Sequence, residues 1–234
     1  MSKTSILHNS FKVLLIIFLI ILFEGCSRDQ VQSSEPDDVP DYEGKIVALG
    51  DSLTAGLNVI PSEAYPALLE KKLLGKGYMF EVINAGISGE TSSGALSRIK
   101  WILTQEPDMV ILETGANDGL RGIDPELTKK NIDSIIQILK QNNVIVVLAG
   151  MNMVLNLGEI FTSAFAKIFP DVAGTHGIIL IPFFLDGVAG EPVLNQGDGI
   201  HPNASGYTIV TETVYPYVIR GIESIRNNIE KEVD

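Results

Sequence analysis

The chain has 234 residues, of which 45% are hydrophobic, and this is enough for one sizeable core but too little for two. Its formal net charge is -12, and it becomes -13 without the first 25 residues, because 15 basic and 28 acidic residues then remain. So acidic a chain argues against nucleic acid and anionic lipid headgroups as partners. The single cysteine rules out an intrachain disulfide.

The N-terminus predicts an export signal over residues 1–26. Lys3 and Lys12 precede 11 uninterrupted apolar residues, 13–23. At ~1.5 Å per residue this run is too short to cross a ~30 Å hydrocarbon core, so a signal peptide is favoured over a membrane span. Cys26 follows a small residue in a setting that resembles a bacterial lipobox, although Glu24 departs from that pattern, and an ordinary or uncleaved signal is the alternative. We expect an exported lipoprotein, anchored through Cys26 and facing the periplasm or the cell exterior.

Residues 27–44 predict a solvated, flexible tether, because they contain six acidic residues, two prolines and almost nothing apolar. From Lys45 the pattern changes, and residues 45–234 predict one folded domain.

Five short runs of apolar residues predict strands that are buried on both faces. Longer amphipathic segments between them predict helices, one of which is capped by Asp124 with Pro125 at its first position. This alternation predicts an α/β fold in which helices cover both faces of a five-stranded parallel sheet. The expected strands are 46–49, 80–84, 109–113, 144–149 and 178–181, and the expected helices are 91–103, 125–143, 156–169 and 205–228, the last of them broken at Pro216.

Each predicted strand end delivers polar groups to one rim of the sheet, where ligands bind in such folds. Ser52 follows the first strand, Gly86 the second and Asn117 the third, while Asp198 and His201 follow the last. A serine hydroxyl becomes a nucleophile when an imidazole accepts its proton, and a carboxylate holds that imidazole in the right tautomer. Backbone N–H groups and a side-chain amide can stabilise the negative oxygen that then develops. These residues predict acyl-transfer chemistry.

Four motifs, GDSLTAG, NAGISGETSSG, LETGANDGLRG and GDGIHPNASG, occur in this order between residues 45 and 207. They resemble the four blocks of the GDSL or SGNH hydrolase family. Within that family, their sequences are most similar to the bacterial branch of acyl-CoA thioesterases, lysophospholipases and arylesterases. The resemblance implies a flavodoxin-like three-layer α/β/α sandwich without cofactor or metal. It also implies a catalytic triad and an oxyanion hole: Ser52, His201 and Asp198 form the first, and Ser52 N–H, Gly86 N–H and Asn117 Nδ2 form the second.

Other interpretations of the same residues are weaker. Asp51 is expected to orient the turn beside Ser52, and His176 is expected in a loop. A phosphate loop at residues 86–94 lacks the required Lys and glycine spacing, and Asp51, Asp198 and His201 alone are thin support for a metal site.

The expected substrate is a small acyl ester or thioester, and the expected enzyme is a monomer. Apolar residues around 151–157 and 181–185 favour an acyl chain over the rival substrate, an O-acetylated carbohydrate or peptidoglycan. A non-catalytic lipid-binding lipoprotein is the alternative from another class.

Overall fold

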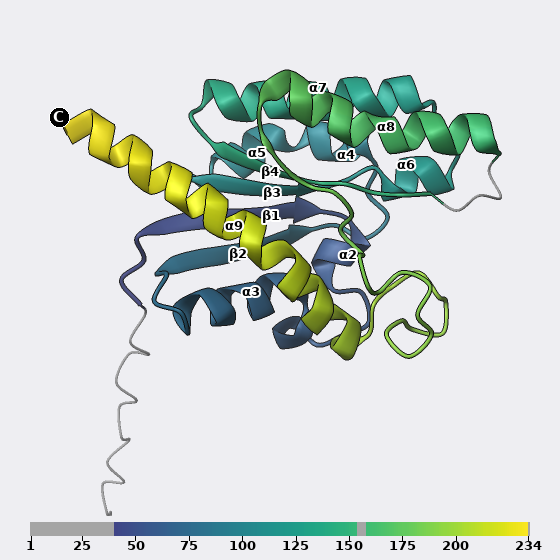
Figure 1. Cartoon of the computed structure of the whole chain (residues 1–234), viewed down its shortest axis with the longest axis horizontal. Coiled ribbons are helices and arrows are strands. Elements are labelled where there is room, and N and C mark those ends of the chain that lie inside the picture. The colour runs from purple at the N-terminus through teal and green to yellow at the C-terminus, as the bar shows by residue number, and fades with distance from the viewer. Residues whose placement is uncertain (1–39, 154–157, 234) are drawn as a thin grey trace, which may run out of the picture. The chain divides into compact units, whose positions relative to one another are not determined.

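The computed structural model describes residues 40–153 and 158–233, so the predicted signal, Cys26 and most of the tether lie outside the described residues. A parallel five-stranded sheet forms the centre of the domain (Figure 1). Its order is β2-β1-β3-β4-β5, the flavodoxin-like order. The predicted α/β fold is therefore confirmed. The strands are β1 (Gly44–Gly50), β2 (Phe80–Gly86), β3 (Met109–Glu113), β4 (Ile145–Ala149) and β5 (Ile179–Ile181).

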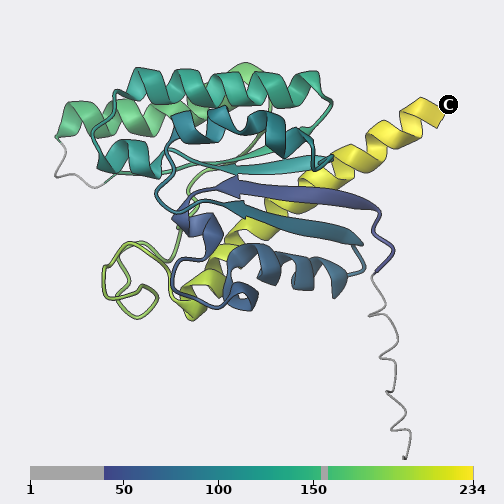
Figure 2. The same ribbon diagram turned by 180° about the vertical axis from the view of Figure 1, so that it is seen from behind.

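Helices cover both faces of this sheet, as the uniformly apolar strands require. On one face, α3 (Tyr65–Leu74) packs beside α9 (Ala204–Val233); on the other, α7 (Pro125–Gln141) lies between α8 (Glu159–His176) and the pair α4 and α5 (Figures 1 and 2). Residues 46–49 of β1 and 109–112 of β3 are completely buried. Three short elements lie in the connections between strands and helices: α2 (Ser52–Ala55), η1 (Pro61–Glu63) and α6 (Ala116–Leu120).

The prediction of one continuous helix over residues 91–103 is wrong. The structure has α4 (Ser92–Ser97) and α5 (Ile99–Leu103), separated at Arg98, where φ is -105° and ψ is 8°. The Arg98 side chain turns toward the ends of β1 and β2, where it binds two backbone carbonyl groups. The start of α7 agrees with the prediction, because the Asp124 carboxylate accepts a 3.0 Å hydrogen bond from Glu126 N–H.

Two prolines lie inside helices, although we expected Pro216 to break one of them and the other to end at residue 169. α9 continues through Pro216, and α8 continues through Pro170 to His176, so His176 is a helical residue and not the predicted loop residue. Both prolines are exposed, and water can therefore bind the carbonyl groups that a proline leaves without an N–H partner. The opposite face of α9 is held in the core by Val210, Val214, Val218 and Ile222.

The domain extends slightly further toward the N-terminus than predicted. Tyr42, near the end of the predicted tether, donates a 2.7 Å hydrogen bond to Glu70 Oε1, and Glu43 N–H donates to Met79 O. Among the described residues, no helix combines the length and apolarity that a membrane span needs.

Candidate active site

Ser52 lies where the strand order reverses, between the carboxyl ends of β1 and β3. It is the first residue of α2, and Asp51 is the N-cap, whose Oδ1 accepts a 2.9 Å hydrogen bond from Leu53 N–H. The role predicted for Asp51, orienting the turn, is therefore confirmed. Ser52 is only 8% exposed, so it lies at the edge of the folded core, where its neighbours hold it in place.

The predicted partners of Ser52, His201 and Asp198, lie beside it although they are almost 150 residues away in sequence. His201 Nε2 lies 2.9 Å from Ser52 Oγ, and His201 Nδ1 lies 2.8 Å from Asp198 Oδ2. With its proton on Nδ1, the imidazole donates to Asp198 and accepts from the serine hydroxyl. The structure thus brings together the three residues predicted as a triad, in the order that serine activation requires.

Asp198 is kept ionised by its own loop. Its Oδ1 accepts hydrogen bonds from His201 N–H at 3.0 Å and Ile200 N–H at 2.9 Å. These two bonds, together with the contact to the His201 ring, lower the pKa of Asp198 to about 2. The side chain is 41% exposed, so water screens the pair, and its main effect is to orient the ring.

Gln196 joins the loop of His201 to the segment after α2, and sequence reasoning missed it. Its Nε2 donates to Leu57 O at 2.7 Å and to Pro202 O at 2.9 Å, while its Oε1 accepts from Asn58 Nδ2 at 3.1 Å. The bonds to Leu57 and Asn58 span 139 and 138 positions of sequence, and they fix the loop of His201 relative to the segment that follows Ser52. Nothing in the local sequence distinguishes this glutamine from a surface residue.

The predicted oxyanion donors are close to the triad but are paired within the chain. Gly86 N–H donates to Asn84 Oδ1 at 3.0 Å, and Asn117 Nδ2 donates to Asp51 Oδ2 at 2.8 Å. An amide nitrogen carries two hydrogens, so Asn117 keeps a second donor. The Asn84 side chain is exposed, and a charged oxygen would compete well with its neutral amide oxygen for Gly86 N–H.

Gly86 is required by packing. A Cβ at this position would stand 2.2 Å from Ala55 N and 2.6 Å from Ala55 Cα. The end of β2 therefore touches the backbone of α2, the helix that begins with Ser52. Only glycine allows this approach, which places the Gly86 peptide next to the serine.

A buried carboxyl pair lies beneath the serine turn. Glu113, the last residue of β3, accepts hydrogen bonds at Oε2 from Asp51 N–H at 3.1 Å and Thr54 Oγ1 at 2.9 Å. Burial and the neighbouring Asp51 carboxylate raise the pKa of Glu113 well above its usual value, and burial also raises the pKa of Asp51. Both effects favour the protonated form of Glu113. The signal for this pair in the sequence is an acidic residue, Glu113, at the end of an otherwise apolar strand.

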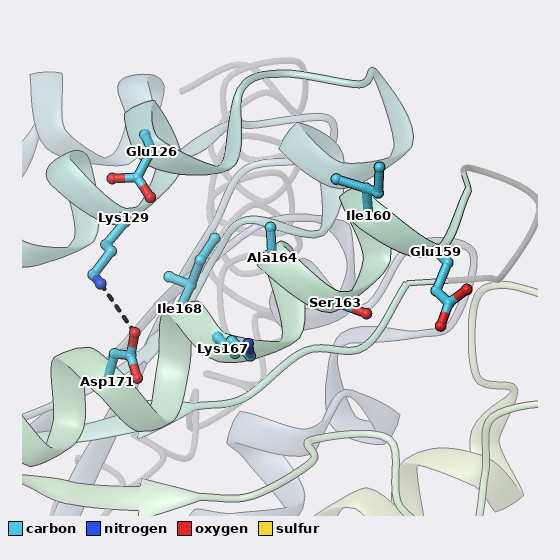
Figure 3. A pocket seen from close by; sticks show the side chains of 9 residues that line it. All are labelled: Glu126, Lys129, Glu159, Ile160, Ser163, Ala164, Lys167, Ile168 and Asp171. Carbon is cyan, nitrogen blue, oxygen red and sulfur yellow. Dashed lines mark hydrogen bonds and ion pairs between the residues drawn. The ribbon is translucent and has the colours of Figure 1, made fainter.

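Neither a metal site nor a second catalytic site is found among the described residues. Among the described residues, no group of three His, Cys, Asp or Glu side chains has an arrangement that could hold a metal ion. A cavity of about 520 Å³ lies between α7 and α8, where Lys129 and Asp171 form a 3.0 Å ion pair (Figure 3). Its lining includes Ser163 but none of the predicted site residues, so it lacks a base beside a nucleophile.

Comparison with known proteins decides the family. Residues 48–209 match the GDSL-like lipase/acylhydrolase family. The chain belongs to this family. It is thus an enzyme of the ester hydrolase class, and the matched region contains all five of the predicted site residues.

Relatives of this acylhydrolase carry enzyme names. Esterase TesA of Pseudomonas aeruginosa is 38% identical over 172 residues, which are 73% of this chain and 86% of the relative. A protein of Escherichia coli named as thioesterase 1, protease 1 and lysophospholipase is 38% identical over 168 residues, 71% of this chain and 79% of that protein. The crystal structure of the psychrotrophic esterase EstA from Pseudoalteromonas, inhibited by monoethylphosphonate, has a TM-score of 0.74 at 31% identity and covers 77% of this chain and 100% of that one.

Proposed function

We propose that this acylhydrolase cleaves carboxylic esters or thioesters of acyl chains, with Ser52 as nucleophile and His201 as general base. The observation that carries the proposal is the continuous series of hydrogen bonds from Ser52 Oγ through the imidazole to Asp198, at 2.9 and 2.8 Å. The ring donates its Nδ1 proton to Asp198, which fixes the tautomer, and its Nε2 accepts from the Ser52 hydroxyl, which gives the serine a base.

The reaction follows from these positions. Ser52 Oγ attacks the carbonyl carbon while His201 Nε2 takes the hydroxyl proton, and the same nitrogen returns the proton to the leaving alcohol or thiol. The acyl group is then bonded to Ser52. Water attacks this acyl-enzyme, His201 again takes a proton, and the carboxylic acid leaves as Ser52 Oγ is protonated. Asp198 orients the ring and stabilises its positive charge in both steps.

Three donors are proposed to stabilise the tetrahedral intermediates: Ser52 N–H, Gly86 N–H and Asn117 Nδ2. In acyl-transfer enzymes the loss of one such donor costs about 10²- to 10³-fold in kcat. Asn117 is held by the buried Asp51, so its free hydrogen has a fixed direction. This fixed direction is what a donor to a developing charge requires.

The apolar surroundings of the site favour an acyl chain as substrate. Of the apolar residues that we expected to favour it, Met151, Ile181 and Phe184 are buried in the core, Met153, Phe183 and Leu185 are partly exposed, and residues 154–157 lie outside the described residues. Ile87 beside Gly86 and Ile200 beside His201 are nearly half exposed, at 49% and 46%. Apolar side chains at these places favour aliphatic chains over sugars.

The decisive experiment compares Ser52→Ala with Ser163→Ala, a matched serine from the α7–α8 cavity. We expect Ser52→Ala to lose hydrolysis of p-nitrophenyl esters and labelling by a fluorophosphonate, and Ser163→Ala to retain both. Activity in Ser52→Ala would contradict the proposal. A series of acyl esters and thioesters of increasing chain length, run beside an O-acetylated sugar, then separates the main substrate class from its rival.

Export and lipid anchoring are part of the proposal and rest on the sequence alone. A cleaved signal followed by a lipidated Cys26 would leave the acidic tether between the membrane and the domain. Cell fractionation of the full chain and of Cys26→Ala tests this. The expected result is that the membrane fraction loses the protein when the cysteine is replaced, and an unchanged distribution would contradict the anchor.

A further inference from the structure

Arg98 forms a nearly buried ion pair behind the predicted oxyanion site. Its Nε donates to Glu90 Oε1 at 2.7 Å, and its Nη2 donates to Glu90 Oε2 at 2.6 Å. The two side chains are only 13% and 8% exposed. Such a two-point pair fixes the plane of the guanidinium group and leaves little freedom for its other contacts.

The same guanidinium group binds the carboxyl ends of β1 and β2. Arg98 Nη2 donates to Ala85 O in β2 at 2.7 Å and lies 3.3 Å from Gly50 O in β1. The shorter contact matters more, because Ala85 O belongs to the same peptide group as Gly86 N–H. In a planar trans peptide the carbonyl and the N–H point in opposite directions. Arg98 therefore holds this peptide from behind, and the N–H points away from it.

We propose that Arg98 is a positioning residue for catalysis, which orients and polarises the Ala85–Gly86 peptide so that Gly86 N–H donates to the negative oxygen of the reaction. This inference rests on the proposed function. A charged donor on a carbonyl draws electron density through the conjugated peptide, and the N–H at its other end becomes a stronger donor. Gly86 N–H is already directed at a side-chain oxygen, that of Asn84.

Arg121 provides a matched control on the next loop. Its Nη2 donates to Gly89 O at 2.7 Å, so it is also an arginine bound to a backbone carbonyl, only three residues from Gly86. The peptide that follows Gly89 carries Glu90 N–H, which donates to Ile87 O within the loop. The Arg121 side chain is exposed, and the backbone bond from Arg121 N–H to Asn117 O is kept when the side chain is replaced.

The test compares Arg98→Gln with Arg121→Gln by ester kinetics and by NMR of the Gly86 amide. Loss of the donor itself would cost about 10²- to 10³-fold, so loss of its polarisation is expected to lower kcat about tenfold with little change in KM. The Gly86 amide proton should move to lower chemical shift in Arg98→Gln and stay in place in Arg121→Gln. A folded Arg98→Gln enzyme with unchanged kcat, or with lowered kcat and an unmoved Gly86 resonance, would overturn the inference.

If Arg98→Gln does not fold, Glu90→Gln keeps the arginine and removes the charge that fixes it. It should move the Gly86 resonance in the same direction with a smaller loss of kcat, and an unmoved resonance would equally count against the inference. The NMR measurement does not depend on the reaction. Failure of the proposed function, seen as activity in Ser52→Ala, is therefore distinguishable from failure of the role of Arg98.

Discussion

Replacement of Gly86 by alanine tests whether the end of β2 sets the position of the serine. The new Cβ would stand 2.2 Å from Ala55 N, whereas ordinary contacts begin at 3.4 Å, so the two backbones must separate by about 1.2 Å. Ala55 and Ser52 share the single turn of α2, which the Ala55 N–H to Asp51 O bond of 2.9 Å closes. The shift is therefore passed to the nucleophile.

A displacement of this size has a predictable cost. Misplacing a reacting group by ~1 Å lowers the rate about 10²-fold, and overpacking of a filled site costs ~1–3 kcal/mol of stability. We expect Gly86→Ala to remain folded, with kcat for p-nitrophenyl esters reduced about 10²-fold. Urea unfolding and steady-state kinetics measure the two effects separately.

Gly174→Ala is the control for this experiment. Gly174 lies in α8, is exposed, and has nothing within 4 Å of an added Cβ. The change should leave kcat unaltered and raise stability by ~0.5–1 kcal/mol, because alanine favours a helix more than glycine does. The reasoning about Gly86 is refuted if Gly86→Ala folds and retains the kcat of the parent enzyme.

Two further predictions concern the buried acid and the proline of α9. The folded chain binds the proton of Glu113 more tightly than the unfolded chain, so the free energy of unfolding should fall as pH rises above the ordinary glutamate pKa of 4.5. Glu113→Gln keeps an oxygen acceptor and should make this fall shallower in urea titrations at successive pH values; an identical pH dependence would show that Glu113 is ionised. Pro216→Ala restores an N–H inside α9 and should raise the free energy of unfolding by ~1–3 kcal/mol without changing kcat, and an unchanged melting temperature would contradict this.

Local patterns were sufficient for the sheet, because strands buried on both faces must be apolar along their whole length. The predicted and observed strands agree to within two residues, and Asp124 caps α7 as expected. The helix ends were less predictable. Pro170 and Pro216 stay inside helices since they face water on elements that the core holds in place, and Arg98 breaks a helix to reach carbonyl groups far from it in sequence.

The sequence by itself determined which residue types stand at the strand ends, and the parallel sheet then required them to share one rim. The sequence therefore predicted the residues of the active site: Ser52, Gly86, Asn117, Asp198 and His201. Only the tertiary structure decided how these groups are held. The link from Gln196 to Leu57, the buried Glu113 beneath Asp51 and the Arg98 contact to Ala85 O join separate segments of the chain. Such contacts depend on packing geometry, which no local pattern of residues records.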